Sequence, residues 1–444
     1  MKLATFRGGV HPFEGKELSR HRAIVDFVPE SETMVYPLSQ HIGAPAVPAV
    51  KVKEYVKVGQ CIGLAQGVVS ANVLSSVSGT VKAIAPHLTA SGAMVQSIII
   101  TNDFLYEKVE EFGKERDWTL LTREEKLEII KAAGIVGMGG AAFPTHVKLS
   151  PKNPDAIDTV IVNGAECEPY LTSDERVMLE EPEKVIGGLQ IILSLFPNAK
   201  GVIGIESNKP EAVKKLTEMS EGLPNISVCP LKTKYPQGGE RTLIYAVTGR
   251  KINYQMLPAD VGCVVDNIDT VVSVYQAVAK GFPLLRRIVT VTGDAIASSV
   301  NFRVPTGVLY KDLVEKAGGF CKEPAKILSG GPMMGQALFS LEIPVTKNSS
   351  ALTCLSRDEV AESKESPCIR CGRCAQVCPG HILPQLAVEY AQRGDLEMFE
   401  KVDGLECCEC GCCSYICPAR RPLTQVMKQA RKDTLALKRQ KGGR

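Results

Sequence analysis

Two cysteine runs near the C-terminus contain the residues best suited to chemistry. Both read C-x2-C-x2-C-x3-C-P, once in residues 368–379 and again in residues 407–418. With this spacing, three thiolates bind one iron–sulfur cube and the fourth reaches across to a second cube, so the runs predict single-electron transport. The predicted pair of [4Fe-4S] clusters has a first cluster on Cys368, Cys371, Cys374 and Cys417, and a second on Cys407, Cys410, Cys413 and Cys378.

Zinc is the alternative metal for these runs, because C-x2-C pairs also hold tetrahedral zinc with four ligands per ion. A third thiolate after two residues and a fourth after three would crowd a single ion, so the spacing favours clusters. Cys408 and Cys412 fall outside the pattern. We expect these two side chains to pack near a cluster rather than to bind iron.

The composition is that of an ordinary soluble protein. The chain has 444 residues, of which 44% are hydrophobic and 23% charged, enough for roughly three or four domains. Ten of the 16 cysteines lie between Cys368 and Cys417 and the others are scattered singly, which favours a reducing compartment over disulfides. A net charge of +3 gives no argument for nucleic acid, and the absence of a long apolar run predicts no membrane-spanning segment.

The N-terminal region, residues 1–103, predicts a β domain. Its short alternating apolar runs are rich in Val, Ala, Gly and Pro. Residues 56–63 and 75–81 look like the two halves of a lipoyl-type barrel sandwich, whose carrier lysine sits on the hairpin between them. No lysine occurs between Lys57 and Lys82, so a swinging arm is excluded and a structural or docking role is left.

The middle of the chain predicts a parallel α/β sheet. Thr122 and Glu125 form a capping box at the start of a helix, and strands at 159–162, 201–205 and 226–228 then alternate with helical stretches. Beyond it we expect a smaller unit, then a helical cluster domain, because the apolar spacing in residues 381–400 is helical. The predicted division is 1–103 barrel sandwich, 104–285 Rossmann-like α/β domain, 286–345 smaller unit, 346–356 linker, and 357–444 helical di-[4Fe-4S] ferredoxin-type domain with a basic tail.

A glycine-rich loop, residues 137–142, could hold a phosphate. Its G-x-G-x-x-A pattern resembles a dinucleotide fingerprint, but that fingerprint follows a strand, whereas here a helix precedes the loop. Consecutive glycines nevertheless expose backbone N–H groups and let a flat or anionic ligand approach the chain closely.

This loop resembles the G-x-G-G-A-G-F-P-T-G loop of the flavin-binding subunit of respiratory complex I. The likeness extends to residues 163–169, to residues 235–240, and to Asp266-Asn267, where that family has paired asparagines. The resemblance implies an FMN site of Gly137, Gly139, Gly140, Lys148, Asn163, Glu166, Tyr235, Gly238 and Asn267, and a nicotinamide-nucleotide site of Phe143, Glu168 and Glu240. This chain departs from that family at Met138 (Arg), Ala142 (Gly), His146 (Gly), Ala165 (Asp), Gly239 (Glu) and Asp266 (Asn).

The order of the predicted domains resembles the RnfC family, the FMN-domain members of Rnf complexes, which are membrane-bound, ion-translocating ferredoxin:NAD+ oxidoreductases. The resemblance implies that residues 104–285 form an FMN/NADH-binding domain and that residues 286–345 form a β-grasp domain. It also implies a peripheral subunit at the cytoplasmic face of the membrane that receives ferredoxin-derived electrons through a partner subunit. FMN suits the step between two-electron hydride transfer and one-electron clusters, and no side-chain general acid or base is expected. The alternatives are a soluble FMN/[4Fe-4S] reductase of the cobalamin-reductase type, with the modules in another order, and a flavin-free two-cluster subunit.

Overall fold

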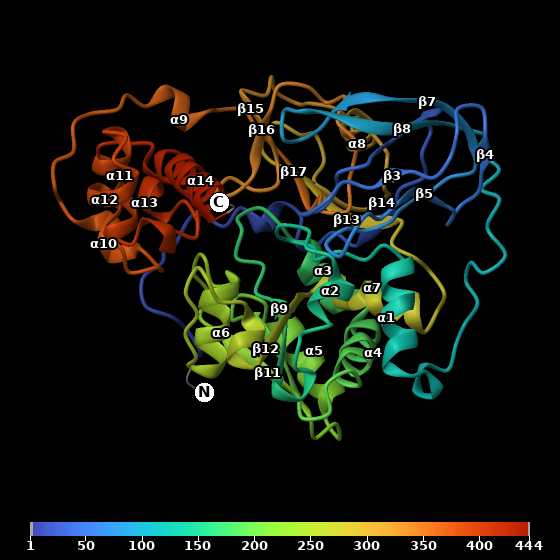
Figure 1. Ribbon diagram of the computed structural model, residues 1–444. Coiled ribbons are helices and arrows are strands. Elements are labelled where there is room, and N and C mark those ends of the chain that lie inside the picture. The colour runs from blue at the N-terminus through green and yellow to red at the C-terminus, as the bar shows by residue number, and fades with distance from the viewer. Residues whose placement is uncertain (1–2, 443–444) are drawn as a thin grey trace.

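The computed structural model describes residues 3–442, whose strands form four sheets. In Figure 1 the α/β unit (green to yellow) lies below two β-rich units, and the cysteine-rich helices (orange to red) lie to one side. The N-terminal segment (dark blue) runs between those helices and the α/β unit.

The N-terminal β unit consists of two small sheets in the orders β2-β8-β7-β4 and β3-β5-β6. The neighbouring strands pair antiparallel, and the unit is all β as the alternating apolar pattern predicted. The strands are β2 (Thr33–Pro37), β3 (Val47–Pro48), β4 (Tyr55–Val56), β5 (Cys61–Leu64), β6 (Val73–Leu74), β7 (Gly79–Leu88) and β8 (Met94–Asn102).

The α/β unit has a four-stranded sheet in the order β11-β10-β9-β12, and every pair is parallel. The order reverses between β9 and β12, and ligands of such sheets bind at the carboxyl ends of the strands at that point. Thr122 and Glu125 form the predicted capping box. The elements are α1 (Arg123–Ala132), α2 (Thr145–Lys148), β9 (Thr159–Gly164), α3 (Ser173–Glu180), α4 (Pro182–Leu193), β10 (Lys200–Glu206), α5 (Pro210–Ser220), β11 (Ile226–Leu231), α6 (Glu240–Thr248), β12 (Cys263–Asn267) and α7 (Ile268–Val278).

A six-stranded mixed sheet follows in the order β1-β14-β13-β17-β15-β16. Its first strand, β1, comes from the N-terminal segment and pairs parallel with β14. One hydrophobic core joins this sheet to the N-terminal β unit, since Tyr36 and Ile98 pack with Val289, Phe302 and Tyr310. The elements are β1 (Ile24–Asp26), β13 (Arg286–Thr292), β14 (Val300–Pro305), α8 (Tyr310–Lys316), β15 (Lys326–Ser329), β16 (Gln336–Leu338) and β17 (Ala351–Leu355).

The C-terminal region is helical, as the apolar spacing in residues 381–400 predicted. The chain forms two helices there, because Gly394 adopts a left-handed φ of 74° and the Asp395 side chain caps the second helix. The helices are α9 (Glu359–Glu362), α10 (Arg373–Val377), α11 (Pro384–Gln392), α12 (Leu396–Lys401), α13 (Cys412–Tyr415) and α14 (Leu423–Gly442). The last two residues of the basic tail lie outside the described part. Within residues 3–442 no helix combines the length and apolar character needed to cross a membrane.

Candidate functional site

The two cysteine runs fold as a repeat of 39 residues, from Cys368 to Cys407. In both copies the residue two positions after the first cysteine is left-handed, with φ 54° at Arg370 and 58° at Glu409. The N–H groups of these residues donate to Sγ of Cys368 and of Cys407, each at 3.4 Å. Such backbone donors stabilise thiolates, so both turns suit metal-bound sulfur.

A side-chain partner follows the third cysteine of each run by 11 residues. Sγ of Cys374 lies 3.2 Å from Gln385 Oε1, and Sγ of Cys413 lies 3.4 Å from Thr424 Oγ1. Both partners lie near the start of a helix, Gln385 in α11 and Thr424 in α14. The amide and the hydroxyl can each donate a hydrogen bond to a thiolate.

The four cysteines predicted to hold the second cluster share one small cavity. Its lining includes Cys378, Cys407, Cys410 and Cys413, together with Cys408 and Cys412. Burial raises the pKa of the Cys378 and Cys413 thiols, and that of Cys407 to about 12. Ionisation of these buried thiols therefore needs a bound cation, and the donor set fits an iron–sulfur cluster.

The cysteines predicted for the first cluster lie nearer the surface. Cys368 and Cys371 are exposed, Cys374 is buried, and Cys417 is half-buried. The N–H of Ser366 donates to the carbonyl of Ala419 at 3.0 Å, which brings the first run alongside Cys417. Across residues 3–442, no group of three or more His, Cys, Asp or Glu side chains converges closely enough to hold a single metal ion.

The glycine loop faces the carboxyl ends of β9 and β12. A Cβ added to Gly139 would lie 3.2 Å from Asn267 Nδ2, and one on Gly137 would lie 3.8 Å from Lys148 Nζ. The space between the glycine loop and these strand ends is here called the opening. Across it, Asn163 Nδ2 donates to the carbonyl of Gly238 at 2.8 Å. Gly140 is exposed beside this opening. These predicted FMN residues therefore meet at the point where the strand order reverses, and the glycines leave space there.

Asp266 explains one departure from the complex I pattern. Its side chain is buried, and Oδ1 lies 3.2 Å from Lys148 Nζ, which also donates to the carbonyl of Val265 at 2.7 Å. Oδ2 has no hydrogen-bond partner among residues 3–442. The carboxylate thus holds the lysine at the edge of the opening, where the ammonium can still meet a phosphate.

Met138 marks a second departure, since the complex I pattern has arginine at this position. In this chain a buried arginine from a distant strand, Arg287, packs against the loop instead. The Arg287 guanidinium contacts Met138 Sδ and pairs with Asp269, and it donates to the carbonyl of Ser349 at 3.1 Å. Burial lowers the pKa of Arg287 to about 10. The sequence alone offered no signal for this residue, which lies in β13, far along the chain.

The two predicted glutamates of the 163–169 segment are both held by the chain. Glu166 is buried and accepts from the N–H of Asp174 at 2.6 Å at the start of α3, and burial raises its pKa to about 7. Glu168 Oε1 accepts from the N–H groups of Met333 at 2.7 Å and Met334 at 3.1 Å. Glu166 thus connects the segment to the start of α3, whereas Glu168 connects it to the loop after β15.

The remaining predicted residues lie around the same opening. Phe143 is half-buried in the glycine loop, and Glu240 is exposed at the first position of α6. Tyr235 is buried, and its hydroxyl has no hydrogen-bond partner in the described part of the chain. Its ring therefore contributes packing here.

Tyr235, one of the predicted FMN residues, contacts the second cysteine run directly. Val10, Tyr235, Cys410 and Cys412 form one hydrophobic cluster, and Met333 and Val377 pack against it. Sγ of Cys412 lies 3.8 Å from the carbonyl of Tyr235. The second cysteine run thus contributes two cysteines to this cluster, whereas the first run contributes only the side chain of Val377.

The N-terminal segment clamps this contact, and the sequence reasoning missed it. Val10 exchanges two backbone hydrogen bonds with Tyr235, at 2.8 and 2.9 Å, and the N–H of Gly9 donates to the carbonyl of Val377 at 2.8 Å. Further along, Lys16 is buried, lies 3.8 Å from Glu166, and donates to the carbonyl of Glu168 at 3.1 Å. The double glycine Gly8-Gly9 was the available signal, because both residues are left-handed.

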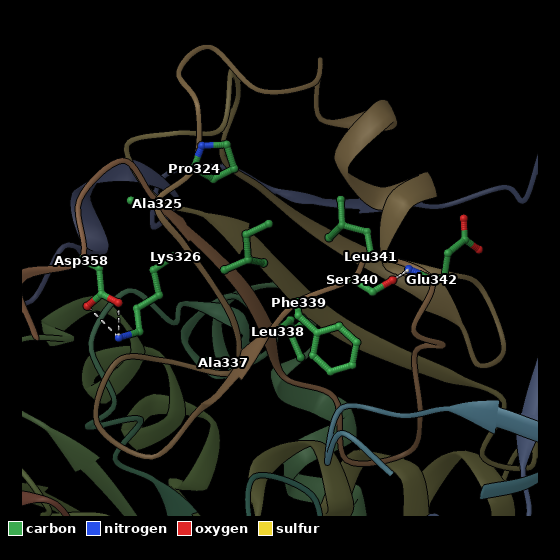
Figure 2. A pocket seen from close by; sticks show the side chains of 11 residues that line it. Pro324, Ala325, Lys326, Ala337, Leu338, Phe339, Ser340, Leu341, Glu342 and Asp358 are labelled. Atoms are coloured by element: carbon green, nitrogen blue, oxygen red, sulfur yellow. Dashed lines mark hydrogen bonds and ion pairs between the residues drawn. The ribbon is translucent and has the colours of Figure 1, made fainter. Parts of the chain in front are cut away.

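A separate open depression lies on the six-stranded sheet beside the edge strand β16. Figure 2 shows the Lys326–Asp358 ion pair on one side of it and Phe339 on the other. The ion pair measures 2.8 Å, and Phe339 is 78% exposed. None of the predicted site residues lines it.

Three protein families match successive parts of the chain. The RnfC barrel sandwich hybrid domain matches residues 4–105, the Nuo51 FMN-binding domain residues 130–276, and the SLBB domain residues 288–337. The predicted barrel sandwich and FMN-binding α/β domain are thereby confirmed.

Proteins similar over nearly the full length give the same answer. The chain is 44% identical to the C component of the proton-translocating ferredoxin:NAD(+) oxidoreductase complex of Clostridium ljungdahlii, covering 98% of this chain and 95% of that protein. It is 40% identical to the C component of the Na(+)-translocating ferredoxin:NAD(+) oxidoreductase complex of Acetobacterium woodii, covering 99% of each. A crystal structure of an NAD+-reducing [NiFe]-hydrogenase is 20% identical with a TM-score of 0.51, covering 66% of this chain and 55% of that one, and supports the fold alone.

The fold and the site define a redox-complex subunit in which an FMN-binding domain is joined to a cysteine-rich helical region. The chain belongs to the RnfC family, whose members are subunits of ion-translocating ferredoxin:NAD+ oxidoreductase complexes. This confirms the family resemblance and decides against the soluble reductase of the cobalamin-reductase type.

Proposed function

We propose that this chain is the NAD(H)-, FMN- and iron–sulfur-binding subunit through which an ion-translocating complex exchanges electrons between ferredoxin and NAD+. The observation that carries the proposal is the direct packing of Cys410 and Cys412 against Tyr235, which joins a cysteine run to the flavin opening. The names of the full-length relatives supply the overall reaction.

The chain's own residues would bind and orient the cofactors. FMN, when bound, supplies the exchange between hydride transfer and single-electron transfer. The N–H groups around Gly139 and the ammonium of Lys148 face the opening and suit a phosphate, and the amides of Asn163 and Asn267 suit hydroxyl groups. Phe143 offers an apolar face to a nicotinamide nucleotide.

Glu168 and Glu240 would accept hydrogen bonds from ribose hydroxyls in the nucleotide site. The two repeats would hold two [4Fe-4S] clusters with the ligand sets given above, and the second cluster would lie next to the flavin. Cys408 and Cys412 would bind no iron. No side chain in this arrangement is assigned as a general acid or base.

The domain division would keep the boundaries expected from the sequence at 103 and 285. The expected boundaries at 345 and 356 would not hold, because β17 (Ala351–Leu355) lies inside the six-stranded sheet. The segment expected as a linker, 346–356, would therefore belong to the β-grasp domain, as would β1 (Ile24–Asp26). The subunit would sit peripherally at the cytoplasmic face of the membrane and receive ferredoxin-derived electrons through a partner subunit.

An anaerobic absorbance experiment tests the proposal. The chain is reconstituted with iron, sulfide and FMN, and its spectrum is recorded before and after one equivalent of NADH. Retained flavin that NADH bleaches, followed by a fall in the broad cluster absorbance, is the expected result. Absence of retained flavin, or flavin indifferent to NADH while dithionite reduces the clusters, would leave only a flavin-free two-cluster subunit.

Two matched variants test the order of the clusters. Cys413→Ser removes a ligand of the second cluster, so NADH should still bleach the flavin but should no longer reduce the first cluster. Cys374→Ser removes the equivalent ligand of the first cluster, and NADH should then still reduce the second. The reverse pattern would place the first cluster next to the flavin.

A further inference from the structure

The two cysteine repeats share a backbone conformation but differ in the side chains around their cysteines. Glu409 of the second repeat corresponds to Arg370 of the first, and Cys412 corresponds to Arg373. Three residues after the last cysteine, Arg420 stands where the other copy has His381, and both residues are left-handed. The three arginines all flank cysteines predicted to hold the first cluster.

The second repeat is turned toward this chain. Glu409 forms an ion pair with Arg431 of α14 at 3.0 Å, and Cys412 is fully buried against Tyr235. The side chains of Glu409 and Cys412 thus already have partners within the chain.

The residues that flank the cysteines predicted for the first cluster face solvent. Arg370, Arg373 and Arg420 are exposed, and among the described residues none of the three forms an ion pair. The acid nearest in sequence, Glu365, is taken by Arg421 at 3.4 Å.

Two large apolar side chains lie exposed on the same loops. Ile369, between the first two cysteines, is 66% exposed, and Tyr415, two residues before Cys417, is 46% exposed. The hydrogen bond from Ser366 to Ala419 holds the two loops side by side. Exposed arginine together with aromatic and aliphatic groups is the composition of the centre of a protein interface.

We propose that Ile369, Arg370, Arg373, Tyr415 and Arg420, here called the arginine surface, dock an acidic electron-transfer protein. The inference rests on the proposed function, since it assumes a [4Fe-4S] cluster behind the exposed Cys368 and Cys371. One electron leaves a reduced iron–sulfur centre of the partner and reduces the first cluster, with no bond made or broken. Unpaired arginines would speed the encounter with an acidic partner, and the exposed ligands bring the cluster close to it.

The test uses a purified acidic two-cluster ferredoxin as the probe in place of the acidic partner subunit. It measures electron transfer from this ferredoxin, reduced beforehand, to the reconstituted chain in a stopped-flow instrument. The variant Arg370→Glu/Arg373→Glu/Arg420→Glu reverses the arginine surface. Its matched control, Lys428→Glu/Lys432→Glu/Arg439→Glu, makes the same charge change on exposed residues of α14 that form no ion pair within residues 3–442.

The arginine-surface variant should lower the second-order rate constant about 10-fold or more at low salt and flatten its dependence on ionic strength. The α14 control should lie close to the unsubstituted chain. In both variants NADH should still bleach the flavin and reduce the clusters. If NADH does this in neither the variants nor the unsubstituted chain, the proposed function fails first, which separates the two failures.

Equal slowing by both variants would mean that only net charge matters, and an unchanged rate would mean that the partner docks elsewhere. Either result overturns the proposal. Sedimentation with phosphatidylserine-containing vesicles gives a third outcome. If the arginine-surface variant loses vesicle binding while the ferredoxin rate stays unchanged, the arginines contact lipid and the proposal is wrong.

Discussion

Replacing Lys16 by methionine should destabilise the flavin-binding unit in a pH-dependent way. The ammonium lies 3.8 Å from Glu166 Oε2, and both side chains are 2% exposed, so bulk water has little access to the pair. Methionine keeps much of the length of the side chain but removes the charge and the hydrogen bond to the carbonyl of Glu168. Removing one partner of a buried ion pair costs about 3–5 kcal/mol, because the other charge is left buried and unpaired.

The pH dependence follows from Glu166. Burial raises its pKa from 4.5 to about 7, so the native chain holds a proton that the unfolded chain has released between those values. The stabilisation from that proton is complete below the lower value and is lost as the pH rises through the upper one. Lys16 lowers the pKa of Glu166, so removing Lys16 raises that native pKa further. The free energy of unfolding then continues to fall up to a higher pH.

The variant should therefore lose about 3–5 kcal/mol of unfolding free energy near pH 8.5, but only about 1–2 kcal/mol near pH 5.5, where Glu166 is protonated and only hydrogen bonds are lost. Trp118 is the sole tryptophan and packs against the core of the α/β unit, so its fluorescence in denaturant reports this unfolding. The control Lys214→Met removes an ion pair whose side chains are 77% and 58% exposed, and should cost below about 1 kcal/mol. Equal losses at both pH values, or a loss near pH 8.5 no larger than the control's, would refute the reasoning.

Three further outcomes are expected. Gly139→Ala should weaken FMN binding about 10-fold in a fluorescence titration, because φ is +75° and the new Cβ meets the Asn267 amide at 3.2 Å. The control Gly222→Ala, with φ +84° and nothing within 4 Å of the new Cβ, should leave FMN binding unchanged. Equal effects would contradict the loop's role. Gln385→Leu should lower the reduction potential of the first cluster, and Thr424→Val that of the second, by about 40 mV each in an EPR-monitored titration. The reason is that each variant loses one hydrogen bond of about 1 kcal/mol to a ligand sulfur. A shift in the other cluster's potential would contradict the ligand sets. Cys408→Ser should keep the full iron content of the reconstituted chain, and a loss of half the iron would make it a ligand.

Local signals in the sequence predicted the features that depend on a few neighbouring residues. The capping box at Thr122 needs only four residues. The spacing of the two cysteine runs predicted that Cys378 of the first run would lie with Cys407, Cys410 and Cys413, and these four residues line one cavity. The parallel sheet followed from alternating strands and helices, whose periods can be read within one segment.

The remaining features depend on contacts between distant parts of the chain. Nothing near Lys16 or Arg287 indicates that either is buried beside a partner more than ten residues away. Glu166 matched a family motif, and only the fold reveals that its carboxylate meets the start of α3.

The N-terminal clamp has a consequence for the order in which the chain assembles. Residues of the N-terminal segment pair with residues that are synthesised much later: Ala4 pairs with Leu231, Ile24 with Asn301, and Gly9 with Val377. Such long-range contacts close large loops and form slowly, so the cysteine-rich helices can reach their docked position only after almost the whole chain has been synthesised. The junction between the two redox units is therefore expected to be among the last parts of the molecule to form, which leaves the cysteines accessible for cluster insertion until then.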